Sequence, residues 1–385
     1  MRLISFEPCE LPAGADALRA EVRAFLNEEL ADFPVPAQAR SWGGFDAEFS
    51  QKLGQRGWLG MTWPAPFGPG RTALERYVVI EELLAAGAPV AAHWIAERQS
   101  GPLLLRFGTD EQRAALLPGI AAGETYFCIG MSEPDSGSDL ASIRSRAVPA
   151  EVDGEKGWVV NGRKVWTTYA QHSRYMIALL RTGEPGENRH DGTTQFIVDL
   201  AAPGVTVQPI RNMIGDEEFN EVTFDDVFVP ETMVVGEVGN GWRQVTAELA
   251  FERSGPDRFL SAFALLKALV AVAGEKPSDA AAAAIGRLHA HLAILRAMSL
   301  SVAAQLDAGA EPVLEAAFVK DPGVNFEKSI PEIAHQVIGA SPRIDGGSDF
   351  EQALAYVQQA CVSFSLRGGT TEIMRGVIAR GLGLR

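Results

Sequence analysis

The sequence predicts an α+β protein in which a helical N-terminal domain, a central β-barrel or sandwich and a C-terminal helical bundle follow one another. Residues 1–123 and 236–385 place apolar side chains at helical spacing, whereas residues 124–235 alternate them with a period of two. With 385 residues, the chain also exceeds what one hydrophobic core usually organises. These observations predict three domains with those boundaries.

Helices with recognisable ends fill the N-terminal region. They are predicted over residues 15–30, 45–58 and 72–84. Thr109, followed by Gln112 three residues later, predicts a further helix that begins with a capping box. The neighbouring residues His93 and Trp94 suggest a site, but we interpret them as helix packing.

The central region has the pattern of strands separated by turns rich in glycine and proline. Strands are predicted over residues 126–131, 158–168, 175–180, 195–199, 205–207 and 221–230. Asn161-Gly162 is a dipeptide typical of hairpin turns. We therefore expect a hairpin there that presents the ring of Trp166 close to the hydroxyl of Thr168.

The first of these strands ends at a turn dense in serine, aspartate, proline and glycine, residues 132–139. Successive backbone N–H groups in such a turn can form a nest that binds an anion, and serine hydroxyl groups can donate further hydrogen bonds. This turn is therefore a candidate binding site for an anionic ligand.

The C-terminal region is expected to be helical to its end. Helices are predicted over residues 242–252, 256–272, 278–306, 325–338 and 351–361. Pro256 has no N–H to donate to the carbonyl of Glu252, so the first of these helices bends or ends there. A carboxylate beside the apolar Leu249 and Phe251 is a better base than one in water, although a surface glutamate on a kinked helix has the same sequence pattern.

Charge and composition exclude several classes of function. The formal net charge of −15 argues against nucleic acid and anionic membranes as partners, while a local basic pocket for a small anion stays compatible with it. Three cysteines far apart form no metal or redox motif, and six histidines do not favour a zinc enzyme. Because the sequence shows no signal peptide, membrane-spanning run or Rossmann motif, we expect a cytoplasmic protein without a metal site.

The turn and the strand at residues 158–168 together resemble the acyl-CoA dehydrogenase family of flavoproteins. Ser132 to Asp139 match the family's Ser/Thr-Glu-x-x-x-Gly-Ser-Asp segment, and Asn161 to Thr168 match its Asn-Gly-x-Lys-x-Trp-x-Thr segment. The resemblance covers most of the chain. It implies the helix–barrel–helix fold, FAD as cofactor, and α,β-dehydrogenation of an acyl-CoA. Electrons would pass to a partner such as an electron-transfer flavoprotein.

The resemblance also implies which residues hold FAD. Trp166 would pack against the isoalloxazine ring, Thr168 and Ser132 would hydrogen-bond to the ring system, and Ser138 would contact the phosphates. The matching segments imply further cofactor-binding residues, namely Met131, Gly137, Gln336, Gly339, Gly369 and Thr370.

The catalytic base is where the chain departs from many family members. Those members carry a glutamate directly before the Gly-Thr that is here Gly369-Thr370, but this position is Gly368. A minority place the glutamate on an earlier helix in a Glu-Arg pair, which this chain has at Glu252-Arg253. The resemblance therefore implies Glu252 as the base, with Arg253 supporting the substrate site. Gly368 would leave room for a branched or ring-bearing acyl group.

A second departure concerns the contacts between subunits. The family's Arg-x-x-Phe-Gly loop, which reaches the FAD of a neighbouring subunit, is missing from residues 271–278. FAD binding must then differ or involve a different chain, as in bacterial members that pair two different subunits and act on steroid side-chain thioesters. We therefore expect a homo- or hetero-oligomer. Two alternatives stay open: a non-catalytic half-site subunit of such an oligomer, and a flavin oxidase on the same fold.

Overall fold

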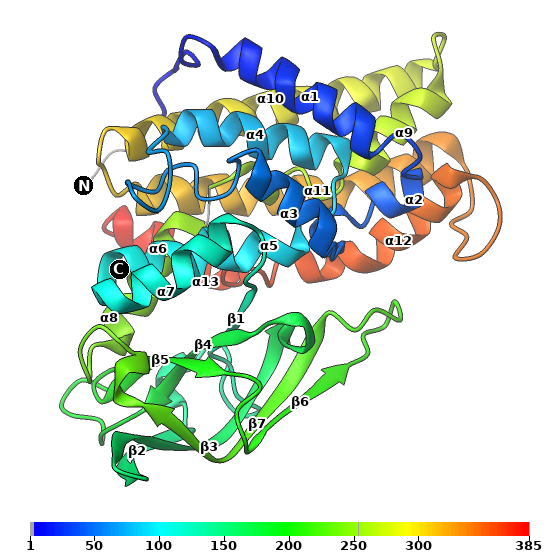
Figure 1. Ribbon diagram of the computed structural model, residues 1–385. Coiled ribbons are helices and arrows are strands. Elements are labelled where there is room, and N and C mark those ends of the chain that lie inside the picture. Colours follow the sequence, from blue (N-terminus) through cyan, green and yellow to red (C-terminus); the bar gives the residue numbers. More distant parts are fainter. Residues whose placement is uncertain (1–3, 253, 385) are drawn as a thin grey trace. The chain divides into compact units, whose positions relative to one another are not determined.

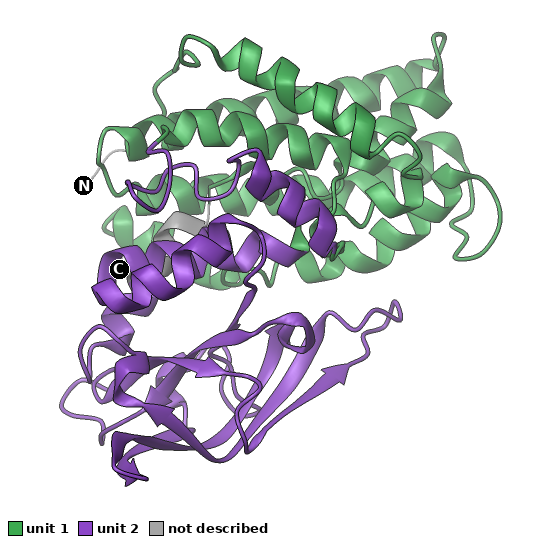
Figure 2. Ribbon diagram, viewed as in Figure 1, with its two compact units in different colours: residues 1–45, 71–91, 250–385 green, residues 46–70, 92–249 purple. Residues whose placement is uncertain are grey.

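The computed structural model describes residues 4–252 and 254–384, and their side chains except those of residues 247–252. The chain folds as two compact units (Figure 2), each assembled from segments that are far apart in the sequence. The helical unit comprises residues 1–45, 71–91 and 250–385, and the sheet unit comprises residues 46–70 and 92–249. The predicted succession of helices, strands and helices is confirmed.

The helical unit is built around α11 (Val313–Ile338), which packs against four other helices of the unit (Figure 1). Those four are α9 (Phe263–Ala273), α10 (Asp279–Asp307), α12 (Asp349–Phe364) and α13 (Thr371–Gly381). The remaining elements are α1 (Ala15–Glu29), α2 (Val35–Gln38), η1 (Ser41–Gly43), α4 (Ala73–Ala86) and η6 (Pro256–Arg258).

The central helix α11 is longer than the sequence predicted, because it begins at Val313 rather than at residue 325. Pro322 and Pro331 lie inside it, and each removes a backbone donor from the helix. Val319 and Val324, on either side of the first proline, are buried. The packing of α11 in the core therefore outweighs the loss of the backbone hydrogen bonds, on which the prediction that a helix ends at proline is based.

The sheet unit combines short helices with one mixed sheet. Its α-helices are α3 (Ala47–Gln55), α5 (Ala91–Ile95), α6 (Gly101–Phe107), α7 (Asp110–Ala121) and most of α8 (Gly241–Glu252). Shorter helical turns are the π-helical η2 (Ala96–Ser100) and the 3-10 helices η3 (Leu140–Ser142), η4 (Ala170–His172) and η5 (Glu231–Met233). Thr109 and Gln112 form both halves of the predicted capping box at the start of α7. His93 is buried, and its Nδ1 shares a hydrogen bond with Ser50 Oγ at 2.8 Å, as expected for helix packing.

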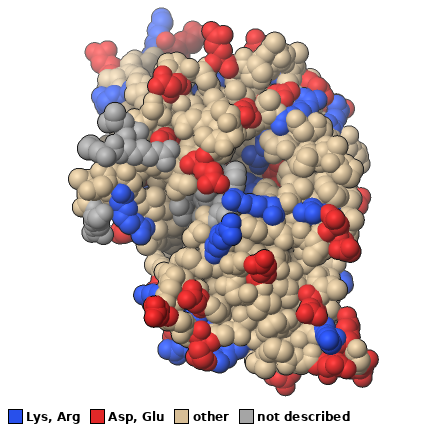
Figure 3. Space-filling model, turned by 90° about the vertical axis from the view of Figure 1, so that its left-hand side faces the viewer, with Lys and Arg blue, Asp and Glu red and all other residues tan. Residues whose placement is uncertain are grey.

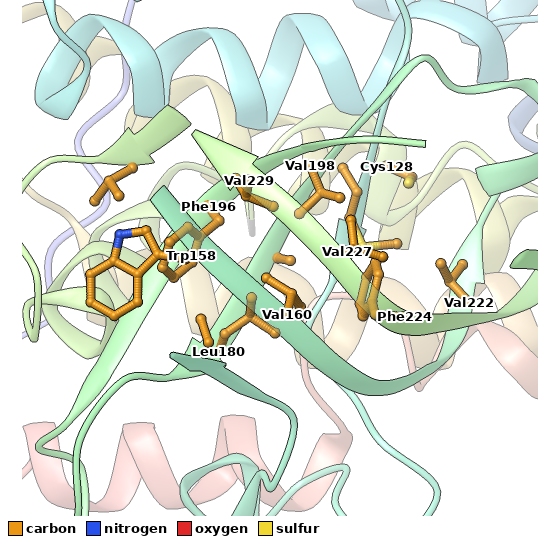
Figure 4. Close-up of a cluster of buried hydrophobic side chains, with 14 of the residues drawn as sticks. Cys128, Trp158, Val160, Leu180, Phe196, Val198, Val222, Phe224, Val227 and Val229 are labelled. Carbon is orange, nitrogen blue, oxygen red and sulfur yellow. The ribbon is translucent and has the colours of Figure 1, made fainter. Parts of the chain in front are cut away.

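The strands of the sheet run in the order β6-β7-β3-β2-β4-β5-β8, and β1 pairs with β4 in parallel. They are β1 (Phe127–Gly130), β2 (Arg146–Val152), β3 (Glu155–Thr168), β4 (Tyr175–Arg181), β5 (Thr193–Asp199), β6 (Val205–Ile210), β7 (Phe219–Pro230) and β8 (Val234–Val235). Apolar side chains of several strands meet in one buried cluster (Figure 4), where Trp158 packs edge-on against Phe196. This buried core carries β3 and the strand β1 from which the turn of residues 132–139 follows.

The predicted hairpin turn at Asn161-Gly162 is wrong. Both residues lie inside β3, and the hairpin between β2 and β3 instead turns at Asp153 and Gly154, which have φ angles of +51° and +82°. Gly162 has a φ of +145°, and the register between β3 and β7 shifts beside it. A Cβ atom there would lie 2.3 Å from Ser145 Oγ, so the glycine allows a β-bulge and the close approach of the residue directly before β2.

Gly162→Ala should therefore lower the free energy of unfolding by about 2–4 kcal/mol, because it adds backbone strain to overpacking. Gly286→Ala is the control, since Gly286 lies within α10 with open space around its Cβ position. This control should raise stability by up to about 1 kcal/mol. Denaturant unfolding measures both, and equal stability of the two variants would contradict the bulge assignment.

Candidate active site

The turn after β1 is held together by its own backbone. Glu133 and Ser136 exchange two backbone hydrogen bonds of 2.7 and 3.0 Å, and the Ser136 hydroxyl donates to the carbonyl of Asp139 at 2.7 Å. Gly137 and Ser138 are exposed, and a Cβ atom on Gly137 would have open space around it. This part of the turn is therefore open to a ligand.

A buried ion pair fixes this turn to β3. The Lys164 ammonium is fully buried and donates to Glu133 Oε1 at 2.8 Å and to the carbonyl of Met131 at 3.2 Å. The Glu133 carboxylate also accepts from the backbone N–H groups of Arg144 at 2.6 Å and Ser145 at 3.0 Å. Three of these four bonds converge on the Glu133 carboxylate, so they connect the turn, β3 and the residues directly before β2.

The protonation of this pair follows from its surroundings. Burial lowers the pKa of the Lys164 ammonium to about 8, against the opposing pull of Glu133. Burial alone raises the pKa of Glu133, but the Lys164 charge and the donated hydrogen bonds outweigh it and hold that pKa below its usual value. Both side chains are therefore charged at neutral pH.

Trp166 lies where the register between β3 and β7 shifts a second time, and its φ of +61° is in the left-handed region. The Trp166 side chain is 60% exposed, with its ring edge-on to Phe219 at 6.2 Å. The N–H of Val165 donates to the carbonyl of Ser132 at 2.9 Å, and the half-buried Thr168 follows at the end of the strand. An exposed ring held by a strained backbone suits a flat aromatic ligand stacked on it.

The sheet unit thus brings the turn of residues 131–138 next to the strand end that carries Trp166 and Thr168. Sequence reasoning did not single out Glu133 and Lys164, which hold the two together. The available signal was a lysine on β3 that shares the even-numbered, inward-facing positions of Trp158 and Val160.

Sequence reasoning also missed a cavity of about 450 Å³ beside the turn. Its lining comprises Ala141, Ser142, Ile143, Arg144, Arg146, Arg181, Glu184, Pro185 and Arg189. The buried Arg181 guanidinium donates to the carbonyls of Ala141 at 2.7 Å and Asp191 at 2.8 Å. Because carbonyl groups are neutral, these hydrogen bonds do not neutralise the positive charge of Arg181. The cavity therefore favours an anion, although the whole chain has a negative net charge.

The charge of this cavity is local. Arg146 pairs with Glu184 at 3.0 Å, and Arg189 pairs with Asp139, so carboxylates offset part of the positive charge. Figure 3 shows acidic and basic side chains interspersed over one face of the molecule. The cavity therefore suits a small phosphorylated ligand better than an extended polyanion.

In the helical unit, α8 ends at Glu252, where Pro256 predicted its end. The Glu252 side chain and the whole of Arg253 lie outside the described residues. Their roles as base and substrate-binding residue therefore stay predictions.

Three predicted site residues, Gly368 to Thr370, form the loop directly before the last helix, α13. Gly368 and Gly369 have φ angles of +64° and +99°, and Thr370 is the N-cap of α13, its hydroxyl accepting from the N–H of Ile373 at 3.4 Å. Gly339 ends α11 at a φ of +68°, and Gln336 is exposed one turn earlier. Their roles toward a cofactor stay predictions.

No group of three or more His, Cys, Asp or Glu side chains within the described ranges is arranged to hold a metal ion. Every helix in this part of the chain is too short or too polar to cross a membrane.

The buried pair gives a first test of how the site is built. Lys164→Met leaves Glu133 buried without its cation and should lower the free energy of unfolding by about 3–5 kcal/mol. The double variant Glu133→Gln/Lys164→Met keeps an acceptor oxygen for one of the two backbone N–H groups and removes the unpaired buried charge, so it should be more stable than Lys164→Met alone. Denaturant unfolding measures the free energy of unfolding of both variants. A double variant that is less stable than Lys164→Met would contradict the claim that the lysine compensates the buried charge of Glu133.

Comparison with known proteins identifies the family. Sequence models of the N-terminal, middle and C-terminal domains of acyl-CoA dehydrogenase match residues 13–124, 128–227 and 239–383. The chain is 35% identical over 95% of its length to the acyl-CoA dehydrogenase FadE34 of Mycobacterium tuberculosis, but it spans only 48% of that relative. It is 34% identical over 96% of its length to the acyl-CoA dehydrogenase IpdE1 of Mycobacterium tuberculosis, of which it covers 97%.

Solved structures agree with these matches. The structure titled Tcur3481-Tcur3483 steroid ACAD is 28% identical with a TM-score of 0.86, and the match covers 98% of this chain and 99% of that one. The ChsE4-ChsE5 complex from Mycobacterium tuberculosis is 29% identical with a TM-score of 0.84, covering 98% of this chain and 100% of the other. The motifs, the fold and these relatives together show that the chain belongs to the acyl-CoA dehydrogenase family, whose members are oxidoreductases that use a flavin.

Proposed function

We propose that this chain binds FAD and removes hydrogen from the α and β carbons of an acyl-CoA thioester. The observation that carries the proposal is the exposed Trp166 ring, held beside the 131–138 turn that the Glu133–Lys164 pair fixes. When bound, the flavin supplies the acceptor for the hydride from the β carbon. The chain's own residues then have to hold the cofactor, orient the thioester and remove the α proton.

The residues around Trp166 fit a flavin. The ring gives a flat aromatic surface. Ser132, whose carbonyl accepts from the N–H of Val165, and Thr168, which ends β3, each add a hydroxyl-bearing residue to this end of the strand. The exposed Ser138 hydroxyl and the backbone of the turn suit the phosphates. We propose Met131, Gly137, Gln336, Gly339, Gly369 and Thr370 as further cofactor-binding residues.

Glu252 is the proposed base that removes the α proton. Gly368, where many relatives carry their glutamate, has a left-handed backbone that favours glycine and has no side chain to act as a base. Glu252 ends α8 directly before the segment that Pro256 redirects. Arg253 is proposed to support the thioester.

The arginine cavity is the proposed site for the phosphates of CoA. Arg144, Arg146 and Arg189 line it with exposed guanidinium groups, which form charge-assisted hydrogen bonds to phosphate oxygens. Such contacts bind the part of the substrate that does not react. They act on affinity rather than on the chemical step.

The acyl group is proposed to be branched or ring-bearing. Gly368 places no side chain in the last loop, and a structurally similar protein is titled a steroid ACAD. The proposed electron acceptor is a separate electron-transfer flavoprotein.

A second candidate is a half-site subunit of a hetero-oligomer. Residues 271–278, which connect α9 to α10 through the Gly274 cap, hold no Arg-x-x-Phe-Gly sequence. A structurally similar protein is titled as a complex of two chains, ChsE4-ChsE5. In this case FAD would be retained only with the second chain.

Glu252→Gln tests the proposed base. The bleaching of bound flavin by an acyl-CoA under anaerobic conditions should slow by about 10²–10⁴-fold, because the proton acceptor is lost while the shape is kept. The exposed Glu275→Gln serves as control and should bleach like the wild type. Equal rates in wild type and Glu252→Gln would reject the base, and chains without flavin would favour the half-site subunit.

Arg144→Gln/Arg189→Gln tests the cavity. Loss of two charge-assisted contacts should raise KM for an acyl-CoA by about tenfold or more, while kcat stays close to the wild-type value. KM for the same acyl group on pantetheine, which has no ADP phosphates, should not change. The exposed Arg174→Gln, whose partner is Asp199, is the control. An equal rise of KM for both thioesters would place the phosphates elsewhere.

A further inference from the structure

One face of α11 carries two buried charged side chains that both reach the last loop of the chain. Lys320 and Glu327 lie seven residues apart, two helical turns along the same face. The Lys320 ammonium donates to the carbonyl of Gly369, and Glu327 Oε2 accepts from the Arg367 guanidinium at 3.2 Å. Gly368 therefore lies between two anchored neighbours.

The same carboxylate reaches the segment that follows Glu252. Glu327 Oε1 accepts from the backbone N–H of Ser261 at 2.6 Å, and the Arg367 guanidinium donates to the Ser261 hydroxyl at 3.1 Å. Gly323, on the same face of α11, lets the backbone approach closely, since its Cβ would lie 2.5 Å from the carbonyl of Arg258. Residues 254–261 and the last loop are thus both held to α11.

This cluster is shielded from water. The Glu327 side chain is 0% exposed and that of Arg367 is 14% exposed. The Arg367 guanidinium stacks over the rings of Phe364 at 4.3 Å and Trp42 at 4.7 Å. A buried ion pair is seldom more stabilising than apolar side chains of the same volume. Stability alone therefore does not explain charged residues here, whereas a need for fixed geometry does.

We propose that Glu327 and Arg367 are positioning residues for the dehydrogenation. They fix the loop of residues 368–370 relative to residues 254–261, the segment that follows Glu252 in the sequence. The proposal rests on the proposed function. Two successive glycines with positive φ give the loop little stiffness of its own, so its position depends on external anchors. Misplacement by about 1 Å can cost about 10²-fold in rate.

Glu327→Gln is the test, since glutamine keeps the shape and an acceptor for Ser261 but loses the charge that faces Arg367. Amide hydrogen exchange in peptides covering residues 255–262 and 365–372 should quicken, and kcat should fall by at least about tenfold with little change in KM. Arg367→Lys, which keeps the charge, should fall between wild type and Glu327→Gln in both measurements. It also replaces Glu327→Gln if that variant does not fold.

Glu82→Gln is the matched control. Glu82 is a buried carboxylate of the same unit that pairs with Arg19 and with Arg23 at 2.7 Å, on α1 rather than on the last loop. It should show a comparable loss of thermal stability, with exchange in residues 365–372 and kcat both unchanged. The same fall of kcat in both variants would reduce Glu327 to a stabilising residue and overturn the proposal.

Hydrogen exchange separates this proposal from the proposed function. Unchanged exchange in both peptides of Glu327→Gln overturns the anchoring, whatever the activity. Faster exchange with an unchanged kcat overturns the role in the reaction. If none of the acyl-CoAs bleaches the flavin bound to the wild-type chain, the proposed function is overturned, and with it the role of Glu327 and Arg367 in dehydrogenation. The exchange result still decides whether these residues anchor the loop.

Discussion

The sheet unit depends on one buried contact, the ion pair between Glu133 and Lys164. The pair joins a turn to a strand that begins well beyond it in the sequence, and it does so where both charges are removed from water. The backbone N–H groups of the two residues directly before β2, Arg144 and Ser145, donate to the same carboxylate. The candidate flavin surface at Trp166 and one wall of the arginine cavity, Arg144, therefore share a single point of support. A change at that point would move both.

The helical unit uses the same device a second time. Glu327, like Glu133, is a buried carboxylate that binds one cationic side chain and a backbone N–H from another segment. In both places the segment that is held contains exposed or half-buried glycines, Gly137 in the first and Gly368 and Gly369 in the second. Glycine allows the backbone conformation that a loop needs near a ligand, but it contributes no packing and little stiffness. The carboxylate supplies the restraint that the glycines lack.

Whether the partners of a residue are near or distant in the sequence explains what the sequence could and could not predict. The capping box at Thr109 and the end of α8 before Pro256 depend on neighbours within four residues, so local rules found both. The Asn161-Gly162 pair gave a wrong prediction, because the glycine is required by the close approach of Ser145, directly before β2, and not by a turn. Lys164 and Glu327 escaped notice for the same reason: their partners are distant in the sequence, and a charged residue without a visible partner reads as surface.

Burying a charge where an apolar side chain would be as stable calls for a reason beyond stability. An apolar contact is nearly free to slide, because its energy depends on area and not on direction. A carboxylate with donors on both oxygens has preferred directions and distances for each of them. Glu133 joins two other segments to its own turn, and Glu327 joins two other segments to its own helix, so each fixes several backbones relative to one carboxylate. The proposed reaction requires a base, a thioester and a cofactor ring to meet within a fraction of an ångström, and directional contacts restrict their positions more than hydrophobic packing alone does.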